Sequence, residues 1–240
     1  MIFLDLDICN WSGAAIAAHD EKGQAMTTPL KIDFVSDVSC PWCIIGLKSL
    51  EQALQRLGGE ARTQIHFQPF ELNPNMGPAG QDIGEHIAEK YGSTPEQMAQ
   101  SRAMIRARGA ELGFSFDMGQ RDRIYNTFDA HRLLHWAGLE GRQGELKHAL
   151  FAAYFSRGEN PSDHAVLARA ALAAGLDGSA AAAVLASDIY ADEVRARERF
   201  YQQQGISSVP AIIINDRHLI SGGQSPDVFE QALRQIISEV

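Results

Sequence analysis

Cysteine is scarce in this chain. The 240 residues contain three cysteines, Cys9, Cys40 and Cys43. Three are too few for the dense disulfide framework of a small secreted domain. A structural zinc site commonly needs two Cys pairs, and there is no second pair, so we expect no metal. The scarcity favours redox chemistry for the two cysteines that stand close together.

Long apolar runs and an excess of positive charge are also missing. No run reaches the ~18–20 apolar residues that a membrane-spanning helix needs. The formal net charge of −9 argues against nonspecific binding to nucleic acid and against docking on anionic membranes. We therefore expect neither nucleic acid nor membrane as a partner.

The first residues lack the features of a secretory signal. The segment from Met1 to Asn10 contains no Lys or Arg, and the run from Ala14 to Ala18 is too short for an apolar core. We therefore expect a cytoplasmic protein. Residues 1–28 are predicted to be a poorly packed N-terminal extension, with Met26 as an alternative start and Cys9 as an incidental residue.

The pattern around the cysteine pair predicts a strand, a turn and a helix. Leu30 to Val35 alternates as a strand does, and Ile44 to Leu57 carries an apolar stripe of helical spacing. Between them lies the sequence Ser39-Cys40-Pro41-Trp42-Cys43. A Cys-x-x-Cys sequence at such a junction is typical of a redox motif.

The chemistry of the pair follows from helix geometry. Proline is favoured at the first helical position, so Pro41 makes Cys40 the expected N-cap. Free N–H groups and the helix dipole favour an anion there, and a thiolate is such an anion. We expect Cys40 to be the exposed attacking thiol and Cys43 the shielded resolving thiol. A pair of inert buried cysteines is the alternative. Trp42 is either a platform for substrate or a partly buried apolar residue.

The rest of the chain predicts an α/β protein with a helical insertion. A second strand over about 62–70 completes a β-α-β unit whose strands are parallel. Residues 79–186 read as helical, and 188–204 as a long charged helix with Ile189, Val194 and Phe200 facing inward. A hairpin over 211–220 and a last helix follow. The predicted domains are residues 29–78 with 187–240, which form one mixed sheet flanked by helices, and the all-helical insertion 79–186.

Two further groups of residues are ambiguous. His131 and His135 have the i,i+4 spacing of metal ligands, but solvated or capping histidines are the preferred interpretation. The segment from Ser221 to Gln224 is either a backbone site for substrate or a simple glycine-rich turn. Val209-Pro210 directly precedes the buried strand, and the local sequence alone favours a trans bond there.

The spaced set of motifs resembles the DsbA family, and more narrowly its FrnE-like, cytosolic branch. The resemblance covers residues 30–238. The matching pieces are Asp33-Phe34, the Cys-Pro-Trp-Cys sequence, Phe70 to Pro74, Asn126-Thr127, Ala130 to Arg132, Gly205 to Pro210 and Ser221 to Gln224. The resemblance implies a thioredoxin fold with a cis bond between Val209 and Pro210, packed against the Cys40–Cys43 pair.

Two positions depart from the family pattern. Strongly oxidising members carry His where this chain has Trp42, so one cationic stabiliser of the thiolate is missing and the disulfide is expected to be less oxidising. A buried carboxylate often lies six residues before the first Cys and assists proton transfer, but that position is Phe34. Asp33 and Asp37 lie near it but are differently placed, which leaves the route of the proton open.

The resemblance implies a thiol–disulfide oxidoreductase or isomerase. Protein or small-molecule thiols and disulfides are the expected partners, and the chain is expected to be a monomer or a homodimer. No bound cofactor is expected, with glutathione as an optional redox partner. The alternatives are a glutathione-dependent isomerase or transferase of the related kappa and hydroxychromene-carboxylate isomerase type, and a holdase-type module that binds apolar peptides.

Overall fold

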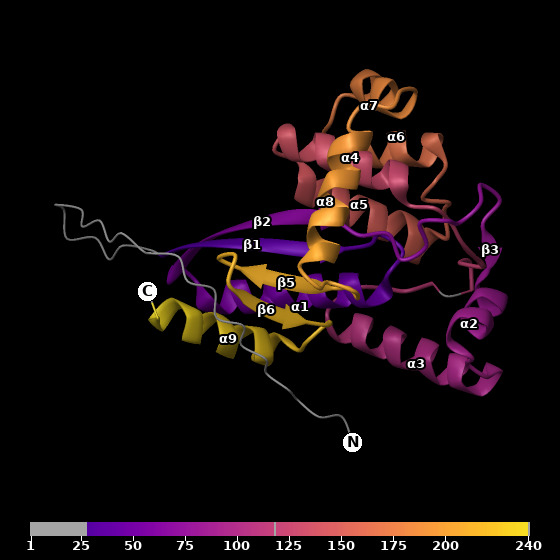
Figure 1. Ribbon diagram of the computed structural model, residues 1–240. Coiled ribbons are helices and arrows are strands. Elements are labelled where there is room, and N and C mark those ends of the chain that lie inside the picture. Colours follow the sequence, from indigo (N-terminus) through magenta and orange to yellow (C-terminus); the bar gives the residue numbers. More distant parts are fainter. Residues whose placement is uncertain (1–27, 118, 240) are drawn as a thin grey trace.

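The computed structural model describes residues 28–117 and 119–239 (Figure 1). The predicted extension and Cys9 lie outside the described residues, apart from Thr28, which begins the first strand. The strands are β1 Thr28–Ser36, β2 Ala61–Pro69, β3 Gln81–Asp82, β4 Arg123–Ile124, β5 Ala211–Ile214 and β6 His218–Ser221. The helices are α1 Pro41–Leu57, α2 Ile83–Tyr91, α3 Pro95–Glu111, α4 Phe128–Leu139, α5 Gln143–Phe151, the π-helix η1 Ala152–Ser156, α6 His164–Ala173, α7 Gly178–Leu185, α8 Ala191–Gln203 and α9 Pro226–Ser238.

The main sheet has the order β2-β1-β5-β6. β1 runs parallel to β2, and Phe34 pairs with Phe67 in that register. β1 also runs antiparallel to β5, which forms a hairpin with β6. The predicted turn residues Asn215 and Asp216 both have positive φ, at 53° and 56°. The predicted mixed sheet with a parallel β-α-β unit and a closing hairpin is therefore confirmed.

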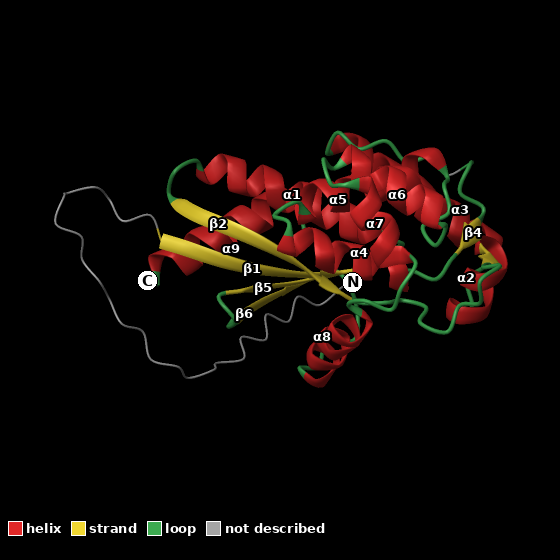
Figure 2. Cartoon of the chain, turned by 90° about the horizontal axis from the view of Figure 1, so that it is seen from above, coloured by secondary structure: helices red, strands yellow, loops and turns green. Residues whose placement is uncertain are grey.

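Helices cover both faces of this sheet. Figures 1 and 2 show α1 and α9 beside each other on one face, whereas α8 crosses the other. Leu30, Ile32 and Phe34 of β1 belong to the main core on the α1 side. Val35 joins Tyr201 of α8 in a smaller cluster on the other side. This alternation follows from the two-residue period of a strand.

The inserted helices are packed in two ways. α4 to α7 share a cluster of apolar side chains of their own, which Val38 joins from the loop before α1. Phe151, Tyr154 and Phe155, from the end of α5 and from η1, instead belong to the main core under the sheet. The insertion is thus joined to the sheet through shared side chains. The domain boundaries at 79 and 186 stay a prediction.

The insertion differs from the expectation in one detail, since β3 and β4 pair inside it. Gln81 lies opposite Ile124, and Asp82 lies opposite Arg123. The ladder joins the chain before α2 to the chain after α3. Two residues are too few to show an alternating pattern, so sequence periodicity could not predict this pairing.

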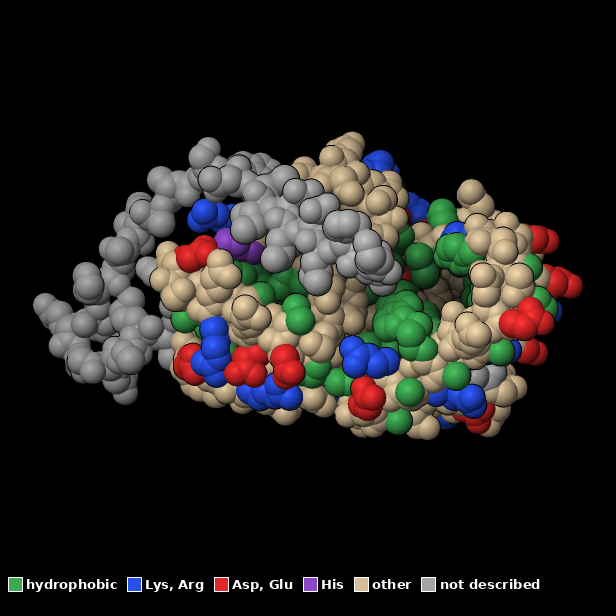
Figure 3. Space-filling view, turned by 90° about the horizontal axis from the view of Figure 1, so that it is seen from below, with side chains coloured by type: hydrophobic (Ala, Val, Ile, Leu, Met, Phe, Trp, Pro, Cys, Tyr) green, Lys and Arg blue, Asp and Glu red, His purple; other side chains and the backbone are tan. Residues whose placement is uncertain are grey.

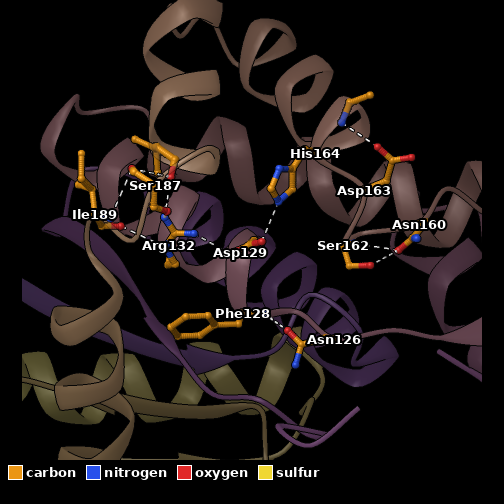
Figure 4. Close-up of polar contacts among 12 residues, drawn as sticks. Asn126, Phe128, Asp129, Arg132, Asn160, Ser162, Asp163, His164, Ser187 and Ile189 are labelled. Atoms are coloured by element: carbon orange, nitrogen blue, oxygen red, sulfur yellow. Dashed lines mark hydrogen bonds and ion pairs between the residues drawn. The ribbon is translucent and has the colours of Figure 1, made fainter. Parts of the chain in front are cut away.

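Helix α8 begins at Ala191, after the predicted start at 188. Arg132 of α4 donates hydrogen bonds to the carbonyl oxygens of Ser187 and Ile189, and Tyr190 has a φ of 67° (Figure 4). These bonds and the left-handed Tyr190 give this segment a turn in place of a helical start. Ile189 is 51% exposed, so the prediction that it faces inward is wrong.

The inward face of α8 is also shifted at its C-terminal end. Val194 is fully buried, as predicted, but Phe200 is 46% exposed. Tyr201 takes the inward position and packs edge-on against Phe200, with ring centres 5.1 Å apart. The prediction for Phe200 is wrong because the buried stripe passes through its neighbour.

In the part of the chain that the structure describes, no helix has both the length and the apolar character needed to cross a membrane.

Candidate active site

Cys40 lies at the N-terminus of α1, as predicted. It is the N-cap residue, with φ −89° and ψ 115°, and Pro41 follows it in the first turn. The Cys40 side chain makes no capping hydrogen bond, and its Sγ lies 3.6 Å from the carbonyl oxygen of Val209. The thiol is placed to donate to that carbonyl oxygen, at the helix end where the first N–H groups of α1 have no partner within the helix.

Cys43 lies one turn further along α1 and is fully buried. Its N–H donates to the Cys40 carbonyl at 3.1 Å, and both thiols are free. Burial, followed by the neighbouring Cys40 sulfur, raises the pKa of the Cys43 thiol well above its ordinary value. The charge of Lys147 and the backbone N–H of Asp37 act in the opposite direction. The prediction that this thiol is shielded is confirmed, and its role as the resolving thiol stays a prediction.

Cys40 is less accessible than predicted. It is 4% exposed, against 0% for Cys43. Cys40 is the more accessible member of the pair, but the prediction of an exposed thiol is wrong. The Val209 segment lies over the sulfur, which a pattern local to α1 could not show.

The loop that carries Val209 and Pro210 packs against the first turns of α1. The peptide bond before Pro210 is cis, as the resemblance implied. A Cβ added to Gly46 would lie 3.1 Å from Pro210 Cγ, and one added to Gly223 would lie 2.9 Å from the Trp42 carbonyl oxygen. The N–H of Gly222 donates to the Pro210 carbonyl at 2.8 Å. The Ser221–Gln224 segment thus uses backbone groups inside the protein, as a glycine-rich turn does.

Partly buried apolar side chains pack against the core cluster that contains Cys40 and Cys43. Trp42, Tyr125 and Val209 are partly buried and pack against the main core. Figure 3 shows hydrophobic side chains gathered beside a hollow, with charged side chains of both signs around them. Trp42 is therefore a partly buried apolar residue, and its use as a platform for substrate stays a prediction.

Asp37 is a buried carboxylate in the loop before α1. It accepts hydrogen bonds from the N–H of Ser39 at 3.0 Å and of Leu72 at 2.7 Å. His131 Nε2 lies 3.7 Å from its Oδ1. Burial alone would raise the pKa of Asp37, but the nearby His131 ring and the two N–H groups outweigh burial and lower the pKa. This carboxylate therefore fixes the loop as an anion.

The two histidines on α4 have different surroundings. His131 is buried beside Asp37, whereas His135 lies against Tyr190 with ring centres 5.1 Å apart. Among the described residues, no group of three or more His, Cys, Asp or Glu side chains is arranged to hold a metal ion.

Several motif residues of α4 position His131 without touching the sulfur atoms. Asn126 Oδ1 accepts the N–H of Phe128 at 2.9 Å, and Asp129 pairs with Arg132 at 2.7 Å (Figure 4). Asn126 also donates to Glu71 at 3.2 Å. These contacts fix the start of α4 relative to β2 and α8, and so hold His131 against Asp37.

Phe34 occupies the position where related enzymes carry a carboxylate. It is fully buried and packs edge-on against Phe67, with ring centres 5.8 Å apart. Asp33 points to the other face of the sheet, where it accepts from Gln68 at 2.6 Å and pairs with Lys31 at 3.0 Å. Neither residue of this pair supplies a carboxylate next to the thiols.

Lys147 is a functional candidate that the sequence reasoning missed. It is fully buried in α5, and its Nζ has no hydrogen-bond partner among the described residues. Burial lowers its pKa from 10.5 to about 8, although Cys43, Asp37 and Cys40 act in the opposite direction. The sequence does indicate that Lys147 is buried, because it lies on the same helical face as Phe151 and Tyr154. A charged side chain is unusual on such an apolar face.

Two residues of the insertion also lie within electrostatic reach of Cys40. Burial raises the pKa of Tyr91, and the charge of Cys40 adds to that increase. Burial lowers the pKa of Arg121, and Cys40 opposes that decrease. The Arg121 guanidinium stacks on Tyr154 and Phe155, 5.0 Å from each ring centre. The insertion therefore contributes to the electrostatic surroundings of Cys40.

Comparison with known proteins agrees with this geometry. Residues 31–234 match the model of the DSBA-like thioredoxin domain family. A probable DsbA oxidoreductase from Streptomyces coelicolor is 34% identical, with a TM-score of 0.82, and the match covers 88% of this chain and 91% of that one. The Bacillus subtilis protein YwbO is 27% identical over 87% of this chain and 96% of its own length.

A more distant structure shares the fold alone. The cytosolic disulfide reductase DsbM from Pseudomonas aeruginosa, with GSH, is 16% identical, with a TM-score of 0.61 over 87% of this chain and 99% of that one. The family match covers most of the chain, including both cysteines of the pair and the cis-proline loop. The chain belongs to the DSBA-like thioredoxin domain family.

Proposed function

We propose that this protein is a thiol–disulfide oxidoreductase that uses Cys40 and Cys43. The observation that carries the proposal is the contact between Cys40 Sγ and the Val209 carbonyl, 3.6 Å apart, at the start of a helix that buries Cys43 behind it. This arrangement places one sulfur where negative charge is favoured and keeps the other protonated until it is needed.

The reaction proceeds by two exchanges. The Cys40 thiolate attacks one sulfur of a substrate disulfide, so a Cys40–substrate bond forms and the other substrate sulfur leaves as a thiolate. Cys43 then attacks Cys40, closing the internal disulfide and releasing the second substrate sulfur. An extended substrate segment pairs with the backbone at Val209. In reverse, the internal disulfide oxidises a dithiol.

The direction in the cell is proposed to be reduction or isomerisation in the cytoplasm. Trp42 replaces the cationic group that makes a disulfide strongly oxidising. The DsbM structure with GSH makes glutathione the first small thiol to test as the reductant. The Cys40–Cys43 potential, measured against a cytosolic poise of about −220 to −320 mV, decides between the directions.

The first prediction separates the roles of the two cysteines. Cys40→Ser is expected to abolish insulin reduction, because no nucleophile remains at the N-cap. Cys43→Ser is expected to trap mixed disulfides on Cys40, which mass spectrometry detects. Cys9→Ser is the control and is expected to keep full activity. Full activity of Cys40→Ser would contradict the proposal.

The same variants test the alternatives. A glutathione-dependent isomerase or transferase needs one reactive group, so its activity would survive Cys43→Ser. A holdase would suppress aggregation in the double Cys-to-Ser variant without any redox turnover. A second thiol buried next to Cys40 favours the oxidoreductase over both alternatives.

A further inference from the structure

Lys147 is buried behind the redox pair without a hydrogen-bond partner for its ammonium nitrogen among the described residues. The nitrogen lies 5.0 Å from the centre of the Phe151 ring and 5.8 Å from that of Phe67. Aromatic faces compensate only part of the cost of removing an ammonium from water. A charge kept at such a cost points to a chemical role.

The titratable groups around Lys147 come from every element packed against it. Cys43 and Cys40 from α1 and Asp37 from the loop before α1 act on it electrostatically. His131 and His135 from α4, His66 from β2 and Arg197 from α8 line the same cavity as Lys147. Cys43 and Asp37 interact with it most strongly. Asp37 is a poor proton acceptor, because His131 and two backbone N–H groups already stabilise its anion.

A cavity of about 210 Å³ has Lys147 in its wall, and neither Cys40 nor Cys43 lines it. Among its lining side chains are Lys147, His131, His135, His66 and Arg197, and no Asp or Glu lines it. His131 Nε2, like Lys147 Nζ, has no hydrogen-bond partner among the described residues. Space for water therefore reaches the two buried nitrogen-bearing side chains next to the redox site.

We propose that Lys147 accepts the proton of Cys43 when the mixed disulfide is resolved, and that this cavity returns the proton to solvent. The proposal rests on the proposed function. Lys147 Nζ makes no hydrogen bond to Cys43, so the Cys43 proton passes to the neutral Lys147 amine through one water, and the Cys43 thiolate attacks Cys40. The Cys43–Cys40 bond forms as the Cys40–substrate bond breaks, and the substrate leaves as a thiolate. Lys147 then releases its proton to water.

Phe34 cannot take part in proton transfer, so another residue must accept the Cys43 proton. The helical insertion supplies the proton acceptor from α5, in place of a carboxylate on β1. Lys147 touches no substrate, and it acts through Cys43. Its pKa of about 8 leaves part of the population neutral near neutral pH.

The experiment separates attack by Cys40 from resolution by Cys43. Reduced protein in a Cys9→Ser background is mixed with one equivalent of 5,5′-dithiobis(2-nitrobenzoate). The first thionitrobenzoate leaves when Cys40 attacks, and the second when Cys43 resolves. With Lys147→Met we expect the second phase to be about a hundredfold slower near neutral pH, with a much smaller change in the first phase. The slowed phase is expected to accelerate steadily with hydroxide from about pH 6 to about pH 10.

Two matched variants sharpen the result. Lys48→Met removes a partly exposed lysine of α1 that pairs with Glu51, and is expected to leave both phases unchanged. Lys147→Arg keeps the charge but cannot release a proton, and is expected to stay slow. Recovery of the second phase in Lys147→Arg would overturn proton acceptance in favour of charge alone.

Other outcomes distinguish the two proposals. A wild-type protein that never releases the second thionitrobenzoate contradicts the proposed function. Two normal phases in both wild type and Lys147→Met overturn only the role of Lys147. A direct NMR titration of the Lys147 ε-carbon needs no variant. We expect a two-step curve in the reduced protein and a single step in the oxidised one, and identical curves would overturn the proposal.

Discussion

Lys147 illustrates at the scale of a single residue how burial links chemistry to stability. Its pKa falls from 10.5 to about 8 because the ammonium is desolvated. The folded state therefore releases this proton at lower pH than the unfolded chain. Below pH 8 both states are protonated and the cost of burying the charge is present in full.

Lys147→Met is expected to raise the stability of the protein below pH 8 and to lose that advantage as the pH rises to 10.5. One pKa unit corresponds to about 1.4 kcal/mol, so the shift from 10.5 to about 8 predicts a change on the order of 3 kcal/mol across this window. Urea unfolding of wild type and variant at several pH values measures it. A variant less stable than wild type at pH 7 would show that Lys147 stabilises the fold.

Asp37 has the opposite linkage. Its pKa is lowered by His131 and by the N–H groups of Ser39 and Leu72, so its stabilisation is present above the unfolded value of 3.8 and is lost as the pH falls through the folded pKa. Asp37→Ala leaves two buried N–H groups without their acceptor, which is expected to cost about 2–4 kcal/mol. Thermal unfolding at neutral pH measures the loss. Asp117→Ala, whose carboxylate accepts only exposed N–H groups, is the control.

At this scale the sequence predicted some site residues better than others. Cys40, Cys43 and Pro41 could be placed because capping and helix spacing are local rules. Lys147 lies more than 100 positions along the chain from Cys43, and no local rule connects them. The low exposure of Cys40 depends on a loop that lies 169 positions away in sequence.

At the scale of elements, Gly46 and Gly223 set how closely α1 approaches the cis-proline loop and the Ser221–Gln224 segment, which Gly222 joins to Pro210 by a hydrogen bond. An added Cβ on Gly223 would lie 2.9 Å from the Trp42 carbonyl oxygen and 3.3 Å from the Gly46 nitrogen. Backbone atoms cannot move aside as a flexible side chain can. The loop and the redox helix must therefore separate if either glycine is enlarged.

Gly223→Ala is expected to lower stability by about 1–3 kcal/mol and to reduce insulin-reduction activity, because Val209 moves away from Cys40. Gly59→Ala is the control, since nothing lies within 4 Å of its added Cβ and it is not in the left-handed region. Activity assays and denaturant unfolding give the two readouts. Unchanged activity in Gly223→Ala would show that the loop tolerates the displacement.

Elements with a clear period could be predicted, and those without one could not. β1, α1 and the β5–β6 hairpin each carry a repeating pattern or a turn signal. The β3–β4 ladder has two residues a side, and the start of α8 depends on Arg132 from another helix. Tertiary contacts decided both.

At the scale of the whole molecule, Arg132 holds the insertion to the helix that leads back to the sheet. The buried guanidinium donates to the carbonyl oxygens of Val184, Ser187 and Ile189, and pairs with Asp129. α4 carries His131 next to it. A change in the position of α4 is therefore expected to move His131 relative to Asp37, and so to alter the surroundings of the redox pair.

Arg132→Met is expected to cost about 3–5 kcal/mol, because one buried and two partly buried carbonyl groups and one carboxylate lose their donor. It is also expected to slow resolution by Cys43 as His131 and Lys147 shift. Arg169→Met, which breaks an exposed pair with Glu159, is the control. Normal resolution in a destabilised Arg132→Met would show that the insertion and the redox chemistry are independent.

The overall architecture could be predicted because the outer segments both showed sheet patterns around a long helical block. The packing of Phe151, Tyr154 and Phe155 into the main core could not be predicted, because an apolar helix face does not indicate which element it packs against.

The burial of Cys40 bears on what can reach it. A sulfur atom in a residue that is 4% exposed can be approached only along a narrow angle. A disulfide in the rigid interior of a native protein cannot enter that angle, whereas one on a slack, unfolded strand or in a small molecule can. In the proposed exchange reaction, steric access to Cys40 is therefore expected to select disulfides in flexible segments or small molecules, independently of their redox potential or binding affinity.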